Sequence, residues 1–247
     1  MSTASAGAPT PRIACVIPAW NEADYLPATL AAWHAAVDAL ALDCELLVAD
    51  DASTDATAAI AQAAGARVLH VAHRQIGATR NAGAAATTAP WLLFLDADTQ
   101  VDARLLRAAL DALAAGAVGG GCTVRLDGPH PSHVRLGVWA AGIGFRYTGV
   151  APGCFLFCSR AAFDAVGGFD PAWYAGEDIA MSRALARQGR FVILRETVRT
   201  SGRKLAHASA WRQLGLLLRF ARRGTGMLRD RDALDLWYGG RDGRPPR

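Results

Sequence analysis

The sequence lacks any apolar run that approaches the roughly 18 residues required by a membrane-spanning helix. Residues 1–11 are rich in Ser, Thr, Ala and Pro, and they contain neither the basic stretch nor the apolar stretch of a secretion signal. We therefore expect residues 1–11 to form a disordered tail. These absences favour a cytoplasmic protein that is soluble or, at most, peripheral to a membrane.

Cysteine is scarce, and the five that occur lie mostly inside apolar runs, at positions 15, 44, 122, 154 and 158. Cys154 and Cys158 lack the close pairing and the histidine partners of a zinc site. This usage is typical of small buried side chains in a reducing compartment, and we do not expect a zinc site.

Acidic side chains are scarce towards the C-terminus. Residues 183–247 contain 16 Lys and Arg against 5 Asp and Glu, whereas the first 182 residues contain 10 against 17. The net charge of +4 hides this asymmetry. An acidic N-terminal region followed by a basic C-terminal segment suggests a metal-binding site followed by a segment that contacts an anionic partner.

Internal repeats and low-complexity linkers are also missing. The chain has 247 residues, of which 52% are hydrophobic and 19% charged, as in a folded globular protein. A chain of this length can bury a single sizeable core. We expect one domain with a C-terminal appendage.

Four short apolar runs alternate with helical patterns in the first half of the chain, at residues 12–18, 44–51, 67–72 and 91–99. Between the first two, residues 23–40 place apolar side chains at every third or fourth position, which predicts a helix. Alternation at spacings of roughly 20 to 30 residues predicts right-handed β-α-β units around a parallel sheet. This is half of a nucleotide-binding α/β fold.

The regular pattern fades after residue 115. Four glycines fall within residues 116–121, and residues 127–149 mix Pro, Gly, His and aromatic residues without a clear period. Such a stretch is typical of segments that shape a variable pocket. The remaining elements that we predict are a buried strand over 152–159, helices over 161–166 and 177–188, and a strand over 190–195 that closes the sheet.

Two carboxylates, Asp96 and Asp98, come at the exit of the apolar run that begins at Trp91. Ligands sit at the carboxyl edge of a parallel sheet, and extended chain aims residues two apart towards the same side. Paired carboxylates suit a hard divalent cation. The alternative is that Asp98 and Thr99 merely begin the next helix.

Several motifs in this order resemble family 2 glycosyltransferases, which have the GT-A fold. The matching segments are Pro18-Ala-Trp-Asn21-Glu22, Asp50-Asp51-Ala-Ser53-Thr54-Asp55-Ala-Thr57, Gly77-Ala-Thr-Arg80-Asn81-Ala-Gly83, Asp96-Ala-Asp98, Pro152-Gly153 and Gly176-Glu177-Asp178. Ala52 replaces the glycine usual in the second motif. The resemblance covers about residues 13–194, and it implies a GT-A type nucleotide-binding sandwich with a mostly parallel central sheet and a basic helical C-terminal appendage.

The resemblance implies a division of the chain. Residues 12–115 would be the nucleotide-sugar-binding half, residues 116–200 the acceptor and catalytic half of the same domain, and residues 201–247 a basic helical segment. It also implies a reaction, in which a sugar moves from a UDP- or GDP-sugar to a hydroxyl acceptor that is lipid-linked, a saccharide or a small molecule. We expect no nucleic-acid partner.

For the donor side, the resemblance implies that Asp98, with Asp96, holds Mn²⁺ or Mg²⁺ against the diphosphate leaving group. Asp96 would also reach the ribose. The residues that would frame the base and ribose are Pro18, Asn21, Glu22 and Asp51.

Structural alternatives stand beside these donor-side roles. Asp50 could fix the turn at Ser53, and Arg80 could either touch the phosphates or pair with an acid of the same edge. Asn21 and Asn81 could simply cap helices.

For the acceptor side, the resemblance implies that Asp178 is the base that activates the acceptor hydroxyl and that Glu177 helps to orient the acceptor or the base. Displacement would be in line, with inversion at the anomeric carbon. The alternative for two acids at a helix start is complementation of the helix dipole, worth about 0.3–1 kcal/mol.

Basic residues follow the last strand. Arg203 could clamp the diphosphate and His207 could complete the metal site, while a solvated basic turn is the alternative. Residues 210–223 predict a basic amphipathic helix that either packs on the sheet or rests on an anionic membrane surface.

The Gln-x-x-Arg-Trp signature of processive synthases is absent, so one sugar per encounter is expected. A non-catalytic sugar-nucleotide-binding or scaffold protein on the same fold is the rival hypothesis, since fold does not guarantee activity.

Overall fold

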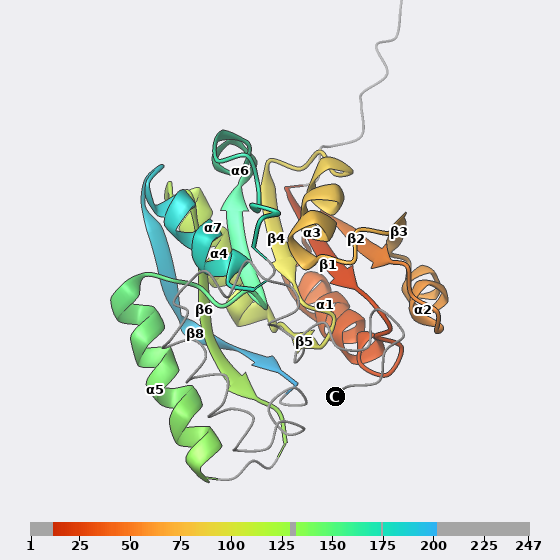
Figure 1. The fold of residues 1–247 in the computed structure, drawn as a ribbon, viewed down its shortest axis with the longest axis horizontal. Coiled ribbons are helices and arrows are strands. Elements are labelled where there is room, and N and C mark those ends of the chain that lie inside the picture. The colour runs from red at the N-terminus through yellow and green to blue at the C-terminus, as the bar shows by residue number, and fades with distance from the viewer. Residues whose placement is uncertain (1–11, 129–131, 174, 202–247) are drawn as a thin grey trace, which may run out of the picture.

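The computed structural model describes residues 12–128, 132–173 and 175–201, which form one sheet with helices on both faces (Figure 1). The tail predicted over residues 1–11 lies outside the described residues. So do residues 202–247, with Arg203, His207 and the helix predicted over 210–223. Within the described ranges, no helix is long and apolar enough to cross a bilayer.

The sheet is mixed but mostly parallel. Its strands in the described residues are β1 (Ile13–Ala19), β2 (Cys44–Asp51), β3 (Arg67–Val71), β4 (Trp91–Leu95), β5 (Thr99–Gln100), β6 (Gly119–Leu126), β7 (Phe155–Ser159) and β8 (Phe191–Thr200). Their spatial order is β3-β2-β1-β4-β7-β6-β8-β5. The first four of these run parallel, as do β6 and β8, whereas β7 is antiparallel to both its neighbours and β5 is antiparallel to β8. The predicted α/β architecture is confirmed.

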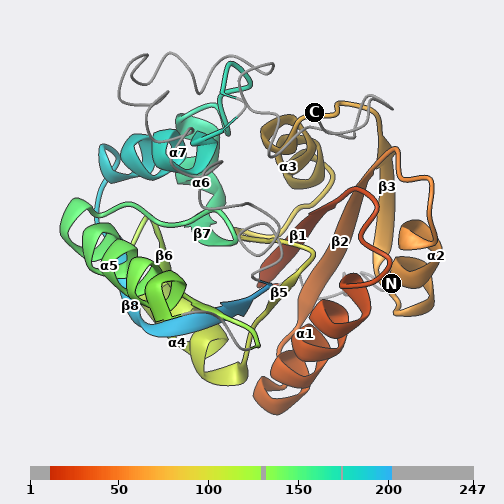
Figure 2. The same ribbon diagram turned by 60° about the horizontal axis from the view of Figure 1, so that its bottom comes forward.

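Helices cover both faces of the sheet (Figure 2). Helices α1 (Leu26–Leu40) and α4 (Ala103–Ala114) pack on one face, and α3 (Ile76–Ala85), α6 (Arg160–Ala165) and α7 (Glu177–Ala186) pack on the other. Helix α2 (Thr57–Ala63) packs near the β3 edge, and α5 (Ser132–Thr148) packs along β6. The sheet is therefore buried on both sides over most of its width.

The strands that lead to the carboxyl edge are held by apolar packing on both faces. Residues 92–95 of β4 are fully buried, as are residues 13–17 of β1. On the α3 side, the ring of Phe94 lies 5.4 Å from that of Phe163 and 5.0 Å from that of Phe169. The end of β4, where Asp96 follows, therefore rests on a rigid core.

The reversal of β7 brings a distant segment to the exit of β4. Because the two strands are antiparallel, Leu95 at the end of β4 pairs with Phe155 at the start of β7. The backbone N–H of Asp96 donates to the carbonyl of Cys154 at 3.2 Å. The Pro152-Gly153 motif thus lies next to the Asp96-Ala-Asp98 motif, although more than 50 residues separate them in the chain.

The glycines that interrupt the sequence pattern begin a strand. At Gly120, an added Cβ would lie 2.3 Å from the carbonyl oxygen of Val192, and at Gly121 it would lie 2.4 Å from the Cβ of Ala151. Only glycine permits this close approach of β6 to its surroundings. The strand therefore starts at Gly119, earlier than the alternation of residues 122–126 indicates.

The interpretation of residues 127–149 as a stretch without regular structure is wrong, because α5 occupies most of it. Its period is obscured because apolar side chains lie on its outer face as well as its inner face: Leu136, Trp139 and Tyr147 are 63%, 64% and 89% exposed. Several boundaries also differ. Helix α1 begins at Leu26 instead of residue 23, and β8 continues to Thr200. The strand predicted over 91–99 ends at Leu95, and the strand predicted over 152–159 begins at Phe155.

The prediction that the cysteines are small, mostly buried side chains is confirmed. All five are free thiols, and four of them are buried, with Cys44 partly so. Burial raises the pKa of Cys44 to about 11 and the pKa of Cys122 to about 12, so both thiols stay neutral. They act as small apolar side chains.

Candidate active site

The predicted residues gather where β1, β2 and β4 end. Three non-glycine residues with left-handed backbone lie in the loops after the first three strands: Asn21 (φ 52°), Ala52 (φ 59°) and Arg74 (φ 52°). Such conformations are uncommon and tend to cluster at functional sites. The φ of Ala52 also explains the usual glycine at this position of the motif, because glycine adopts positive φ without strain.

A cleft at this edge, here called the Asp51 cleft, brings together residues from three separate motifs. Five predicted residues line it: Pro18, Glu22, Asp51, Asp96 and Asp98. Asp51 is 1% exposed, and its Oδ1 accepts the backbone N–H of Arg74 at 2.8 Å. The carboxylates of Asp51 and Asp96, which lie more than 40 residues apart in the chain, thus line the same cleft.

Asn21 lies beside this cleft without lining it. Its exposed side chain accepts the N–H of Thr54 at 2.8 Å, and its own N–H donates to Ser53 Oγ at 2.9 Å. Asn21 therefore ties the loop after β1 to the loop after β2. The alternative that it caps a helix is wrong, since the N-cap of α1 is Tyr25.

Asp50 has the structural role given above as an alternative, because it fixes the turn at Ser53. Its Oδ1 accepts the N–H of Ser53 at 3.3 Å, and its Oδ2 lies 3.1 Å from His70 Nδ1. The side chain is 3% exposed and turned to its own loop. Asp50 thus fixes the turn that presents Asp51.

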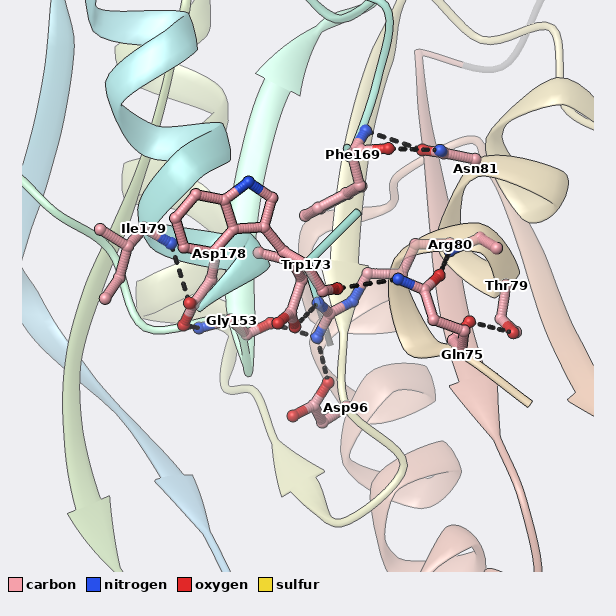
Figure 3. A network of polar contacts seen from close by, with 12 residues as sticks. Gln75, Thr79, Arg80, Asn81, Asp96, Gly153, Phe169, Trp173, Asp178 and Ile179 are labelled. Atoms are coloured by element: carbon pink, nitrogen blue, oxygen red, sulfur yellow. Dashed lines mark hydrogen bonds and ion pairs between the residues drawn. The ribbon is translucent and has the colours of Figure 1, made fainter. Parts of the chain in front are cut away.

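Arg80 joins the two ends of the site (Figure 3). Its guanidinium is 1% exposed and donates to Asp96 Oδ1 at 2.7 Å, to Glu177 Oε1 at 2.9 Å and to the carbonyl of Gly153 at 3.0 Å. Of the two alternatives for Arg80, pairing with acids of the same edge is therefore what the structure shows. Contact with phosphates would require an accessible guanidinium.

Burial alone would lower the pKa of Arg80, but the charges of Asp96 and Glu177 outweigh it and raise the pKa. The group is a permanent cation. Its Nε has no hydrogen-bond partner within the described residues, although Phe169 lies 5.2 Å from the guanidinium carbon. Arg80 thus compensates part of the negative charge that the site collects.

Glu177 and Asp178 stand in the first turn of α7, as predicted. Burial, followed by the charge of Asp178, raises the pKa of Glu177 from 4.5 to about 7. Burial also raises the pKa of Asp178, although Arg80 and the N–H groups of Gly153 and Ile179 oppose the shift. These two N–H groups donate to Asp178 at 2.8 Å each. Both acids hold protons more tightly than exposed carboxyls do.

Further bonds fix α3 to the turn that precedes α7. Asn81 donates to the carbonyl of Phe169 at 2.8 Å and accepts its N–H at 2.9 Å, so it does not cap a helix. Gln75 caps α3 by accepting the N–H of Ala78, and it donates to the carbonyl of Trp173 at 2.8 Å. No local pattern in the sequence indicates these partners, which lie more than 85 residues away.

Asp98 is coupled to the end of β8. The N–H of Ser201 donates to the carbonyl of Asp98 at 3.1 Å, and the hydroxyl of Thr200 lies 3.5 Å from its Oδ1. Asp98 therefore does not begin a helix; α4 is capped by Asp102, which accepts the N–H of Leu105.

No three His, Cys, Asp or Glu side chains form a metal cluster within the described residues. Asp96 and Asp98 nevertheless offer carboxylate oxygens on one cleft, the donor set that Mn²⁺ and Mg²⁺ prefer. Within the described residues, the Arg80 cation pairs with Asp96, and the carboxylates of Asp51 and Asp98 line the same cleft. The residues fit a divalent cation whose other ligands come from water or phosphate.

A second cleft of about 250 Å³, here called the α5 cleft, is also lined by Asp96 and Asp98. Its remaining walls come from β6, α5, Thr200 and Ser201. Sequence reasoning missed the individual residues of this cleft, although it assigned a pocket to the stretch that contains α5.

A family model described as glycosyl transferase family 2 matches residues 14–163. An uncharacterized glycosyltransferase of Mycobacterium bovis is 38% identical over 91 residues, which are 37% of this chain and 38% of that protein. The chain spans 19% to 38% of the length of the curated relatives that it matches.

Two solved structures share the fold. The mannosyltransferase PcManGT of Pyrobaculum calidifontis, in complex with GDP-Man and Mn²⁺, has a TM-score of 0.66 at 18% identity, over 96% of this chain and 66% of that chain. Glucosyl-3-phosphoglycerate synthase of Mycobacterium tuberculosis, in complex with Mn²⁺, UDP and glucosyl-3-phosphoglycerate, has a TM-score of 0.58 at 21% identity, over 87% and 80%. These likenesses confirm the predicted GT-A fold.

Proposed function

The chain belongs to glycosyl transferase family 2, and on this premise we propose that it transfers a sugar from a UDP- or GDP-sugar to a hydroxyl acceptor, with inversion at the anomeric carbon and one sugar per encounter. The observation that carries the proposal is the convergence of Asp51, Asp96 and Asp98 on one cleft at the sheet edge, where Arg80 links Asp96 to Glu177 at the start of α7. Ligands of open α/β sheets bind at this edge.

The donor nucleotide would occupy the Asp51 cleft. Asp51 at the floor would accept an N–H of the base, and Glu22 and Pro18 would border the base and ribose. Asn21 would act by holding the two bordering loops together. The solved relatives with UDP, or with GDP-Man and Mn²⁺, support a nucleoside diphosphate as the ligand.

Asp98 and Asp96 would hold Mn²⁺ or Mg²⁺. A bound divalent cation would stabilise the charge that grows on the diphosphate leaving group. Arg203 and His207 stay predictions for the same region, outside the described residues.

Asp178 would be the base. The acceptor oxygen forms a bond to the anomeric carbon while the bond from this carbon to the diphosphate oxygen breaks. The bonding electrons leave with the nucleoside diphosphate, and the hydroxyl proton passes to a carboxylate oxygen of Asp178. A raised pKa suits this role, because a more basic carboxylate accepts a proton more readily. Glu177, bonded to Arg80, would orient the acceptor or the base.

The test replaces Asp178 by Asn, which keeps the size of the side chain and removes its basicity. We expect transfer to fall by about 10²–10⁴-fold, the usual contribution of a general base. Transfer is measured as nucleoside diphosphate released from UDP- and GDP-sugars in a screen of hydroxyl acceptors. Donor binding, measured as the thermal shift caused by UDP or GDP with Mn²⁺, should persist.

The matched control is Asp164→Asn, at an exposed acid on α6, which should keep transfer at the wild-type rate. If Asp178→Asn transfers as fast as the wild type, Asp178 is not the base. If the wild type binds nucleotide but transfers to no acceptor, the rival hypothesis of a non-catalytic binding protein gains support.

A further inference from the structure

The α5 cleft differs in chemistry from the Asp51 cleft, although both share Asp96 and Asp98. Away from these acids, its walls are apolar: Val124 and Leu126 from β6, and Val138, Ala141 and Phe145 from α5. Its polar end consists of the shared acids with Thr200 and Ser201. A ligand seated here would place an apolar portion between α5 and β6 and a polar portion at the carboxylates.

The size of the cleft indicates that it holds part of a ligand. About 250 Å³ lies below the roughly 300–1,000 Å³ of pockets that enclose a drug-sized molecule. The apolar walls offer no hydrogen bonds from their side chains to a diphosphate or a sugar ring. They suit a hydrocarbon group, whose burial is favourable without polar partners.

The outer face of α5 continues this apolar character into solvent. Leu136, Trp139 and Tyr147 are exposed there, while Arg135 and Arg146 are the helix's charged residues and no acid occurs in it. Exposed apolar groups of this kind mark contact with a ligand, a protein or a lipid surface. Trp, Tyr and Arg are the residues that favour a lipid–water boundary. An amphiphile is therefore the occupant that both faces of α5 favour.

We propose that the α5 cleft binds the hydrocarbon portion of the acceptor, so that the acceptor is a lipid-type alcohol whose hydroxyl-bearing head projects from the apolar walls past Asp96 towards Asp178, which Arg80 and Gly153 join to Asp96. This proposal rests on the proposed glycosyl transfer. It assigns to β6 and α5 the selection of the acceptor, whereas the Asp51 cleft receives the donor. Because the two clefts share Asp96 and Asp98, the two substrates would lie next to each other at these carboxylates.

The first test measures binding of butyl, hexyl and octyl glucoside to the full-length protein by calorimetry, with UDP or GDP and Mn²⁺ present and below micelle-forming concentrations. These probes carry the same hydroxyl head on chains of increasing length. Because each buried methylene contributes about fourfold in affinity, the dissociation constant should fall by up to about 15-fold per two carbons. A dissociation constant independent of chain length would overturn the proposal.

A cleft-filling variant localises the effect. At Gly142 an added Cβ meets Thr123 Cγ2 at 3.5 Å, an ordinary contact, so Gly142→Leu extends into the cleft without a backbone clash. Leucine also has the higher helix propensity. The variant should lose the dependence on chain length while UDP or GDP still raises its melting temperature. Gly144→Leu is the matched control, since its Cβ meets nothing within 4 Å, and it should bind like the wild type.

The competing occupant is the protein itself, because residues 202–247 follow Ser201 at the rim of the cleft. A photoreactive benzoylphenylalanine at position 145 identifies the occupant by mass spectrometry of the crosslinked product. Capture of octyl glucoside supports the proposal. Capture of a peptide from residues 202–247, or of a second copy of the chain, overturns it.

These results separate the inference from the proposed function. If UDP or GDP binds and alkyl glucosides show no dependence on chain length, the acceptor assignment fails while glycosyl transfer stands. If alkyl glucosides bind but no nucleotide or nucleotide sugar does, glycosyl transfer fails and the acceptor assignment falls with it.

Discussion

Residues 12–115 and residues 116–200 build the same sheet in different ways. The first half contributes the four parallel strands β3, β2, β1 and β4, of which β1 and β4 are almost entirely buried, together with the short strand β5. The second half contributes the reversed strand β7 and the helix α5, whose outer face is apolar and exposed. The first half lines the Asp51 cleft, and the second half supplies the apolar walls of the α5 cleft. Three predictions test this contrast.

The largest effect is expected where the two halves meet. Arg80→Gln removes the cation that joins Asp96 of the first half to Glu177 of the second. It leaves both carboxylates uncompensated in a largely buried position, and loss of one partner of a buried pair costs about 3–5 kcal/mol. The free energy of unfolding, measured by urea titration, should fall by this amount.

Arg104→Gln is the matched control, because Arg104 also pairs across the halves, with Glu196 at 3.7 Å, but is 85% exposed. An exposed pair contributes at most about 1 kcal/mol. If both variants lose equally little stability, burial of the Arg80 network does not hold the halves together.

An effect of intermediate size concerns the proton on Glu177. Its pKa of about 7 in the folded state exceeds the ordinary 4.5, so the folded chain keeps a proton that the unfolded chain releases between these values. The free energy of unfolding should therefore decrease as the pH rises from about 4.5 to about 7, by on the order of 3 kcal/mol from this group.

Glu177→Gln cannot titrate, so in chelator-containing buffer its free energy of unfolding should decrease less over this pH range than that of the wild type. Urea titrations of both proteins across the range measure the difference. If the free energy of unfolding changes equally with pH in both proteins, Glu177 does not keep the extra proton in the folded state.

The smallest effects compare helix packing in the two halves. An added Cβ at Gly83 of α3 would lie 2.3 Å from Val16 Cγ1, whereas at Gly137 of α5 it would meet nothing within 4 Å. Gly83→Ala should destabilise by about 1–3 kcal/mol through overpacking. Gly137→Ala should stabilise by up to about 1 kcal/mol through helix propensity. Thermal unfolding of both variants measures the two shifts, and shifts of the same sign would refute the contrast in packing.

The first half could be predicted because its signals are local. A buried apolar run followed by an acid specifies a strand and the edge at which the acid stands, so Asp51, Asp96 and Asp98 were placed on one cleft from the sequence. Their roles with donor and metal stay predictions.

The second half was less predictable because its signals depend on distant partners. A continuous apolar run such as Phe155–Ser159 carries no information on strand direction, so the reversal of β7 was not foreseen. Helix α5 has glycines within it and apolar residues on two faces, which removes the period that identifies a helix. The partners of Arg80 on β4 and α7 likewise depend on tertiary structure.

Strand β5 has only two residues, Thr99 and Gln100, yet it pairs with the end of β8 directly after Asp98. The hydroxyls of Thr99 and Thr200 lie 2.9 Å apart, next to the bond from Ser201 to Asp98. The backbone that directly follows β8 is thus hydrogen-bonded to the backbone of Asp98. A displacement of Ser201 would therefore lengthen or break its hydrogen bond to the carbonyl of Asp98, the residue whose carboxylate lines both clefts.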